Sequence, residues 1–307
     1  METSQDAGVE TTVAAGAGVP QERKIPLRTP NFNFDSLPDR WFADNLVATS
    51  IVNALHLLFP DGERFFIRSV NHYKGSVGDD AELVKAIRDF AGQEGRHGYE
   101  HERVFAKMRE QGYPVDAFLK VFKGFAFDFI EKRSPHALRL ATTAGVEHFT
   151  ATLGRVALDT DLLTNMDPAM ADLLRWHALE EIEHQDVAFD VLQRVNPSLA
   201  LRGAGLAFAG LMVFPFWLGG SVYLIGTKAR SIDDLRSRTG KNPYKMIPWR
   251  KLGKAVVDYL KPGFTPGEAG DDIRIAETRA WYMKRQEAAR TAKAAGSIAA
   301  AAPKGAA

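Results

Sequence analysis

The chain has 307 residues, of which 45% are hydrophobic and 25% charged, so it can bury a sizeable core in one large domain or two small ones. Its net charge of +1 provides no global field of the kind that nucleic-acid binders usually show, and we expect no nucleic-acid partner. The absence of cysteine excludes disulfides, thiolate nucleophiles and cysteine-ligated metals, so any metal must be held by oxygen and imidazole nitrogen.

The two ends of the chain are poor in large apolar side chains. The first 24 residues also lack a basic start followed by an apolar run, so they do not resemble a secretory signal, and we expect a cytoplasmic protein. Residues 1–30 are predicted to form a disordered tail. Residues 271–307 are predicted to form a helix that ends in a mobile tail from Thr291 onward.

Between these ends, apolar residues recur at three- and four-residue steps, which is typical of amphipathic helices. The predicted helices lie at 41–59, 62–74, 80–110, 115–132, 136–159 and 168–193. Glycine and proline mark the breaks between them, for example at Pro60. No segment alternates as a strand does, so the predicted fold class is all-α.

The motif Glu-x-x-His occurs in two of the predicted helices. Glu94 and His97 interrupt the inward-facing apolar stripe of the segment 80–110, and Glu181 and His184 do the same in 168–193. A glutamate and a histidine one turn apart present an oxygen and a nitrogen to the same point, which is the geometry that a metal ion requires.

A lone glutamate precedes each motif on the helix before it, Glu63 in the first half and Glu147 in the second. Four carboxylates balance two divalent cations, and this order of residues is that of ferritin-like di-metal bundles. We therefore predict a ferritin-like four-helix bundle over 31–200, with an added crossover helix that carries a phenylalanine stripe. The stripe consists of Phe118, Phe122, Phe125 and Phe129.

Other placements of these residues remain open. The motifs would also fit the solvent face of amphipathic helices, and Glu180 can replace Glu181 because it too lies one turn from His184. His148 is expected to pack or to support the site rather than to bind metal. Three further glutamates are expected to point into solvent: Glu100, Glu102 and Glu183.

Two additional histidines flank the motifs, His101 one turn after His97 and His177 one turn before Glu181. If the helices are antiparallel, both histidines come to the same level of the bundle. They are then either an extra ligand with its partner, a proton relay, or supporting residues that bond to Glu63 or Glu147.

Four segments resemble the large bacterial family of predicted metal-dependent hydrolases: FPDGERFFIRSVNHY, QEGRHGYEHERVF, VEHFTATLGRV and WHALEEIEHQDVAFDVL. The resemblance covers most of residues 30–265. It implies a metal protein whose site consists of Glu63, Glu94, His97, His101, Glu147, His177, Glu181 and His184.

The region 201–270 contains an uncharged apolar segment, residues 203–227, followed by a basic extension. The segment is long enough to span a bilayer, but Pro215 and residues 219–220 interrupt it. We expect a re-entrant or interfacial segment at the inner face of the membrane, with basic side chains against anionic head groups. The alternative is a buried helix that covers the bundle.

The function predicted from these features is a dinuclear non-haem enzyme that activates oxygen and acts on a hydrophobic or lipid-like substrate. Iron is the preferred metal, with manganese and zinc as alternatives. A metal-dependent hydrolase of an ester or phosphoester is the second reading, and a non-catalytic iron-binding protein the third. The sequence predicts no particular oligomeric state.

Overall fold

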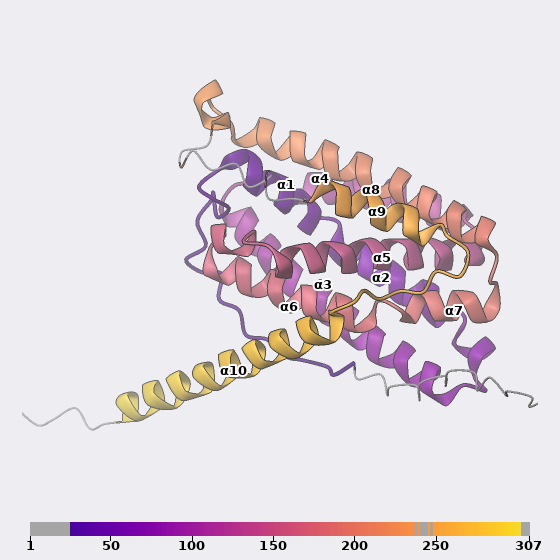
Figure 1. Ribbon diagram of the computed structural model, residues 1–307. Helices are drawn as coiled ribbons and strands as arrows, with labels where there is room; N and C mark the ends of the chain where they lie inside the picture. The colour runs from indigo at the N-terminus through magenta and orange to yellow at the C-terminus, as the bar shows by residue number, and fades with distance from the viewer. Residues whose placement is uncertain (1–24, 237–238, 240–244, 246–247, 302–307) are drawn as a thin grey trace, which may run out of the picture.

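The computed structural model describes residues 25–236, 239, 245 and 248–301. Within this part no strand forms, and the predicted all-α class is confirmed. Figure 1 shows α1 (Leu46–His56), α2 (Phe59–Asn71), α3 (Ala81–Glu110), α4 (Val115–Lys123), α5 (His136–Asp159), α6 (Pro168–His184), α7 (Val187–Val195), α8 (Leu199–Lys228), α9 (Trp249–Tyr259) and α10 (Asp271–Ala301). Shorter helical turns lie between them: η1 (Lys74–Val77), η2 (Gly124–Glu131), η3 (Leu163–Asn165) and η4 (Ile232–Leu235).

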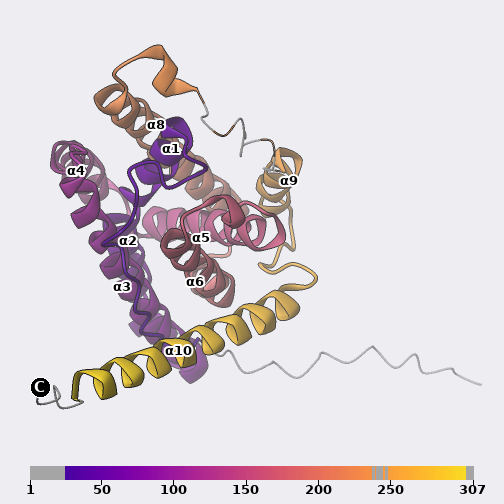
Figure 2. The ribbon, with the colours of Figure 1, turned by 90° about the vertical axis from the view of Figure 1, so that its left-hand side faces the viewer.

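The helices α2, α3, α5 and α6 form the centre of the fold (Figure 2). α2 packs against α3 and α5 packs against α6, while contacts of α2 with α5 and of α3 with α6 close the bundle. The crossover between the two halves is α4 followed by η2. A helical bundle with a helical crossover therefore forms as predicted, and the narrower description as ferritin-like stays a prediction.

Along α3, the bundle interior changes from apolar to polar and back. Ile87 and Phe90 belong to an apolar cluster near one end, and Val104 and Met108 belong to another near the opposite end. Each large apolar side chain buried in these clusters contributes about 1.5–3 kcal/mol. The turns between them, residues 94–101, instead bury glutamates and histidines. The two apolar clusters thus hold a polar layer in the middle of the bundle.

The helix predicted over 41–59 begins later in the structure, at Leu46, and two further predicted boundaries are wrong. We expected a break at Pro60, but α2 takes Pro60 into its first turn, where the missing backbone N–H has no partner to lose. We also expected one helix over 168–193, whereas residues 185–186 separate α6 from α7. There the side chain of Gln185 accepts a hydrogen bond from buried Arg155 on α5, which fixes the interruption.

The phenylalanine stripe of the crossover does not form one helical face. The chain continues from α4 into η2, which is a π-helix and therefore has more residues per turn than an α-helix. Phe122 is consequently buried, whereas Phe125 and Phe129 are exposed. Only part of the stripe contributes to the interior.

The apolar segment forms a single unbroken helix, α8, and is not re-entrant. Pro215 lies inside the helix, where it removes one backbone hydrogen bond without ending it. One side of α8 packs against α5 and α1 (Figure 1). The contact with α5 is so close that a Cβ atom at Gly205 would lie 2.4 Å from the carbonyl carbon of Ala141, so only glycine fits there.

In the part of the chain that the structure describes, both ends are more ordered than the predicted tails. Residues 25–30 lie on the bundle, with Ile25 and Arg28 buried, because Arg28 forms ion pairs with two glutamates of α6. α10 packs against α6 and continues to Ala301, into the segment predicted as a mobile tail, as its alanine content favours. The predicted tails at 1–24 and 302–307 lie outside the described residues.

Candidate metal centre

All eight predicted site residues are buried inside the bundle, none with more than 5% of its surface exposed. The alternative that the two motifs occupy a solvent face is therefore wrong. Glu63 extends from α2, and Gly98 on α3 faces it, where a Cβ atom would lie only 3.0 Å from the Glu63 carboxylate. The lack of a side chain at position 98 thus makes room for this carboxylate between α2 and α3.

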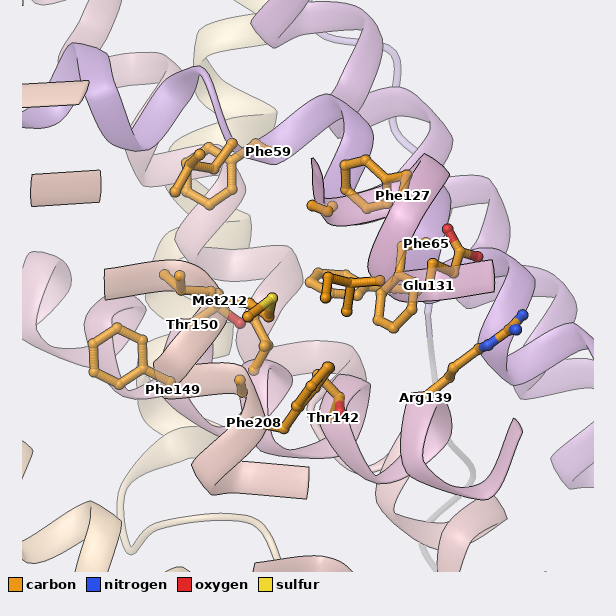
Figure 3. A pocket seen from close by; sticks show the side chains of 18 of the residues that line it. Phe59, Phe65, Phe127, Glu131, Arg139, Thr142, Phe149, Thr150, Phe208 and Met212 are labelled. Atoms are coloured by element: carbon orange, nitrogen blue, oxygen red, sulfur yellow. The ribbon is translucent and has the colours of Figure 1, made fainter. Parts of the chain in front are cut away.

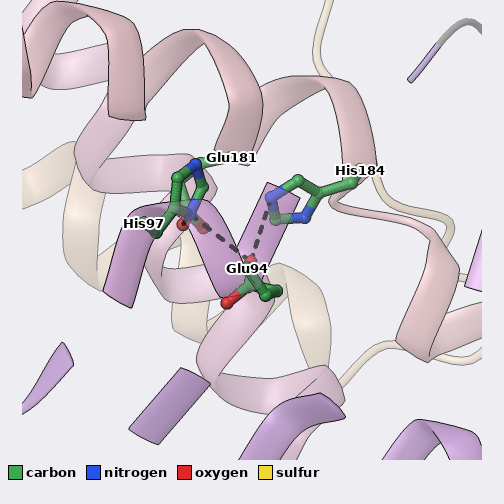
Figure 4. Close-up of side chains that lie close together, drawn as sticks. All are labelled: Glu94, His97, Glu181 and His184. Carbon is green, nitrogen blue, oxygen red and sulfur yellow. Dashed lines mark ion pairs between the residues drawn. The ribbon is translucent and has the colours of Figure 1, made fainter. Parts of the chain in front are cut away.

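The two Glu-x-x-His motifs meet at one point (Figure 4). One ligand atom from each of Glu94, His97, Glu181 and His184 falls within 4.8 Å of the others. His184 Nε2 lies 3.1 Å from Glu94 Oε1, and His97 Nδ1 lies 3.6 Å from carboxylate oxygens of both Glu94 and Glu181. The four donors therefore form one group.

A second group lies beside the first and contains Glu63, His101 and His177, again with ligand atoms within 4.8 Å. His101 Nε2 lies 2.8 Å from His177 Nδ1, so the two extra histidines come together as the antiparallel packing of α3 and α6 predicts. His177 Nε2 is also 2.7 Å from Glu181 Oε1. This contact joins the second group to the first.

Sequence reasoning missed His56, the last residue of α1. It is buried, and its Nδ1 lies 2.7 Å from His101 Nδ1. A continuous line of hydrogen-bonding contacts therefore runs from His56 through His101 and His177 to Glu181. His56 belongs to no motif, and only its position before the lone-glutamate helix could have drawn attention to it.

Glu147 of α5 occupies a different place from the other seven residues. Its Oε2 lies 3.1 Å from His184 Nδ1, and its Oε1 is buried without a hydrogen-bond partner. It belongs to neither of the two groups. Glu147 and Glu94 thus contact the two different ring nitrogens of His184, Glu147 at Nδ1 and Glu94 at Nε2.

Glu180 supports the site from behind and does not replace Glu181. Its carboxylate lies 3.0 Å from His97 Nε2, which leaves His97 Nδ1 directed at the first group. Trp176 Nε1 donates to the same carboxylate at 2.9 Å, and Arg28 pairs with it at 3.0 Å. Glu180 therefore lies outside the group that contains Glu181.

Two of the three glutamates expected to face solvent are buried. Glu183 is held by Arg28 at 2.6 Å, and Glu100 pairs with Arg103 at 2.6 Å. The partner of Glu183 comes from the distant N-terminal segment, whereas Arg103 lies one turn from Glu100 on α3 itself. Glu102, in contrast, is half exposed as expected.

His148 takes the packing role expected of it. Its Nε2 lies 2.9 Å from the carbonyl oxygen of Ala255, and its ring stacks on Tyr259 with centroids 5.0 Å apart. Both partners belong to α9. His148 therefore fastens α9 to α5 on the outside of the bundle.

Burial and mutual contact shift the ionisation of the site. Burial raises the pKa of Glu147 to about 8, and burial followed by the neighbouring Glu94 raises the pKa of Glu63 well above its usual value. For Glu94, contacts with His184 and His97 outweigh burial and lower the pKa to about 2. Burial alone would lower the pKa of His184, but Glu147 and Glu94 raise it well above its usual value.

The unsatisfied atoms of the site fit a bound cation. Both oxygens of Glu63 are buried without a hydrogen-bond partner, as are Glu94 Oε2 and Glu181 Oε2. Orphaned polar atoms of this kind are costly in a protein interior, and a divalent cation compensates for that cost. Carboxylate oxygen and imidazole nitrogen suit iron, manganese and zinc. The residues present therefore fit a metal site.

Metal binding is expected to release protons at neutral pH. The pKa values of Glu63 and Glu147 are raised, so these carboxyl groups hold protons at neutral pH that a nearby cation would displace. Apparent affinity for a divalent metal should therefore increase as pH rises toward about 8. Calorimetric titrations in two buffers of different ionisation enthalpy measure the exchange. Proton uptake on metal binding, or no proton exchange, would contradict this prediction. The variant Glu147→Gln should release about one proton fewer than the unaltered chain when it binds metal.

Two apolar cavities extend from the site along α5. The larger, of about 390 Å³, has Glu181 and His177 in its wall and is otherwise lined mainly by apolar side chains. The smaller, of about 110 Å³, reaches Glu131 and Arg139, on the right in Figure 3. Both cavities share the lining residues Leu55, Phe59, Phe149, Thr150 and Leu153. The polar centre is thus in contact with the larger apolar cavity.

A buried glutamate–histidine centre beside an apolar cavity is typical of a metal-dependent enzyme. The chain belongs to the family described as predicted metal-dependent hydrolase, whose model matches residues 26–270. This confirms the family resemblance of the four sequence segments. Comparisons with curated proteins and with solved structures give no match.

Proposed function

We propose that the protein is a metal-dependent hydrolase that cleaves a carboxylic ester or phosphoester with a long apolar group. The observation that carries the proposal is the position of Glu181 and His177, which belong to the buried centre and also form part of the wall of the 390 Å³ cavity. A substrate in that cavity would have the bond to be cleaved next to the buried glutamate–histidine centre. The family to which the chain belongs supports hydrolysis over other metal chemistry.

In this proposal Glu94, His97, Glu181 and His184 hold one ion, and the second group holds another. Bound metal supplies two effects, a lowered pKa of a bound water and polarisation of the substrate carbonyl or phosphoryl oxygen. Glu180 keeps the His97 ring in place through Nε2.

The remaining residues have supporting tasks in the proposal. The ring of Phe59, stacked on His101 with centroids 4.6 Å apart, keeps water away from that side of the centre. The contact of His101 Nδ1 with His56 Nδ1 fixes the His101 ring, as the contact with Glu180 does for His97.

The test is hydrolysis by the metal-loaded full chain of nitrophenyl esters of increasing acyl length and of a nitrophenyl phosphodiester. We expect metal-dependent cleavage that is the same with and without air and that improves with acyl length. Loss of activity on chelation and recovery with added metal complete the test. Absence of hydrolysis at every metal composition tried contradicts the proposal.

Oxygen activation by a di-iron centre is the second candidate. Its support is the repeated order of a lone glutamate and a Glu-x-x-His motif, which is that of di-iron bundles. The iron-loaded protein, kept anaerobic and then exposed to air, would show an oxygen-dependent optical change in this case. Such a change without hydrolysis favours this candidate, and metal binding with neither reaction favours a non-catalytic iron-binding protein.

A larger side chain at Thr150 is expected to block long substrates selectively. Thr150 lines both cavities, so the ring of Thr150→Phe would take up space that a long acyl chain needs. We expect kcat/KM for a long-chain ester to fall about tenfold or more, with a smaller loss for an acetyl ester. Thr150→Val, of similar volume, is the control, and metal content should stay unchanged in both variants. Equal losses for long and short esters would show that this cavity does not hold the acyl chain.

A further inference from the structure

The side of α8 that faces away from the bundle is an apolar surface. Leu211, Phe214, Leu218 and Val222 follow each other at helical spacing, and between 51% and 69% of each is exposed. Only 22% of the most apolar part of the helix is buried, whereas the core helix of a soluble protein would be mostly buried. Segment 203–227 has no charged residue to interrupt this surface.

Helix α9 has a second apolar surface with basic side chains beside it. Trp249 and Val257 are exposed at 62% and 59%, and the same helix carries exposed Arg250 and Lys254. Large apolar side chains next to basic ones are typical of helices that lie in the interface of an anionic bilayer. The exposed apolar side chains of α8 and α9 are called here the α8–α9 face.

The larger cavity reaches the surface within this face. Most of its lining is buried or half-buried, and its exposed lining residues are Phe214 on α8 and Trp249, Gly253 and Val256 on α9. The opening of the cavity is therefore bordered by these two helices. An apolar cavity that opens through an apolar surface is suited to a ligand that arrives from an apolar phase rather than from water.

We propose that the α8–α9 face docks on an anionic lipid bilayer, so that the cavity between α8 and α9 opens to the lipid. A bilayer offers acyl chains to the apolar stripe of α8 and anionic head groups to the basic residues of α9. A second copy of the chain carries the same positive charges on the same face and would not complement them. Docking does not depend on hydrolysis, so this proposal goes beyond the function proposed above.

Because the chain has no cysteine, single cysteines allow one label at a chosen site. The variants Leu218→Cys on α8 and Val256→Cys at the cavity opening would carry an environment-sensitive fluorophore. Ile273→Cys on α10 is the matched control, since Ile273 is exposed at 64% and Leu218 at 69%. The probes are vesicles of phosphatidylcholine with and without phosphatidylglycerol.

We expect a blue shift of the labels at 218 and 256 with phosphatidylglycerol vesicles, weakened by salt, and no shift at 273. In sedimentation with the same vesicles, Leu218→Glu should bind at least about tenfold more weakly than Ile273→Glu, with metal content unchanged in both. Equal shifts at all three positions, or no shift, overturn the proposal. Shifts that depend on protein concentration without vesicles also overturn it, because the face then joins two copies of the chain.

Discussion

Replacement of Glu94 or Glu181 by glutamine should reduce bound metal to below about one-tenth of the unaltered content. Both carboxylates belong to the first group, and each has at least one buried oxygen without a hydrogen-bond partner. Glutamine keeps the volume of the side chain, so the bundle remains folded, but it removes the negative charge and the carboxylate ligand that a divalent cation needs. Loss of a supporting residue alone typically costs 10–100-fold in affinity, and loss of a ligand should cost more.

The measurement is metal content by mass spectrometry after gel filtration, with circular dichroism as the check of folding. The controls are Glu102→Gln, on the same helix as Glu94 but half exposed, and Glu183→Gln, on the same helix as Glu181. Both controls should retain the metal. Full metal content in Glu94→Gln and Glu181→Gln would show that the metal binds elsewhere.

Arg28→Ala should lower the free energy of unfolding by about 3–5 kcal/mol. The side chain of Arg28 is 7% exposed and pairs with Glu180 and Glu183, which are at most 1% exposed. Removal of the arginine leaves the carboxylate of Glu180 buried without its cation, whereas Glu183 keeps its ion pair with Arg279, and the loss of one partner of a buried ion pair has a cost of this size. Because Glu180 holds His97, the same variant should also bind metal about 10–100-fold more weakly.

Urea unfolding of the metal-free protein measures the first effect. Arg64→Ala is the control, since the ion pair of Arg64 with Glu102 joins side chains that are 46% and 47% exposed. An exposed pair contributes about 0–1 kcal/mol, so the control should unfold almost as the unaltered chain does. Equal effects of the two substitutions would mean that the N-terminal segment is not held as the structure has it.

The helices and the polar layer in the middle of the bundle were predictable because both follow from local periodicity. Glu94 and His97 interrupt an apolar stripe at helical spacing, and that phase alone turns them inward. The spacing of Glu181 and His184 gives the same information for α6. The meeting of all four side chains in one group depends on how α3 and α6 cross, which no local pattern contains.

What the sequence did not predict depends on partners distant along the chain. Glu183 was expected in solvent because its helical phase points away from the centre, but Arg28, far upstream, covers it. His56 was missed because its contact with His101 forms only when α1 packs across the bundle. Pro215 was read as a break, although a proline within a helix that packs along its length can be tolerated.

Anomalous diffraction from crystals of the metal-loaded protein, recorded at the absorption edge of the metal found by mass spectrometry, tests the metal centre most directly. We expect two anomalous peaks enclosed by α2, α3, α5 and α6. One should lie within about 2.0–2.2 Å of donor atoms of Glu94, His97, Glu181 and His184, and the other at similar distances from Glu63, His101 and His177. Peaks outside the bundle, or no peak in a crystal of protein that carries metal in solution, would contradict this assignment.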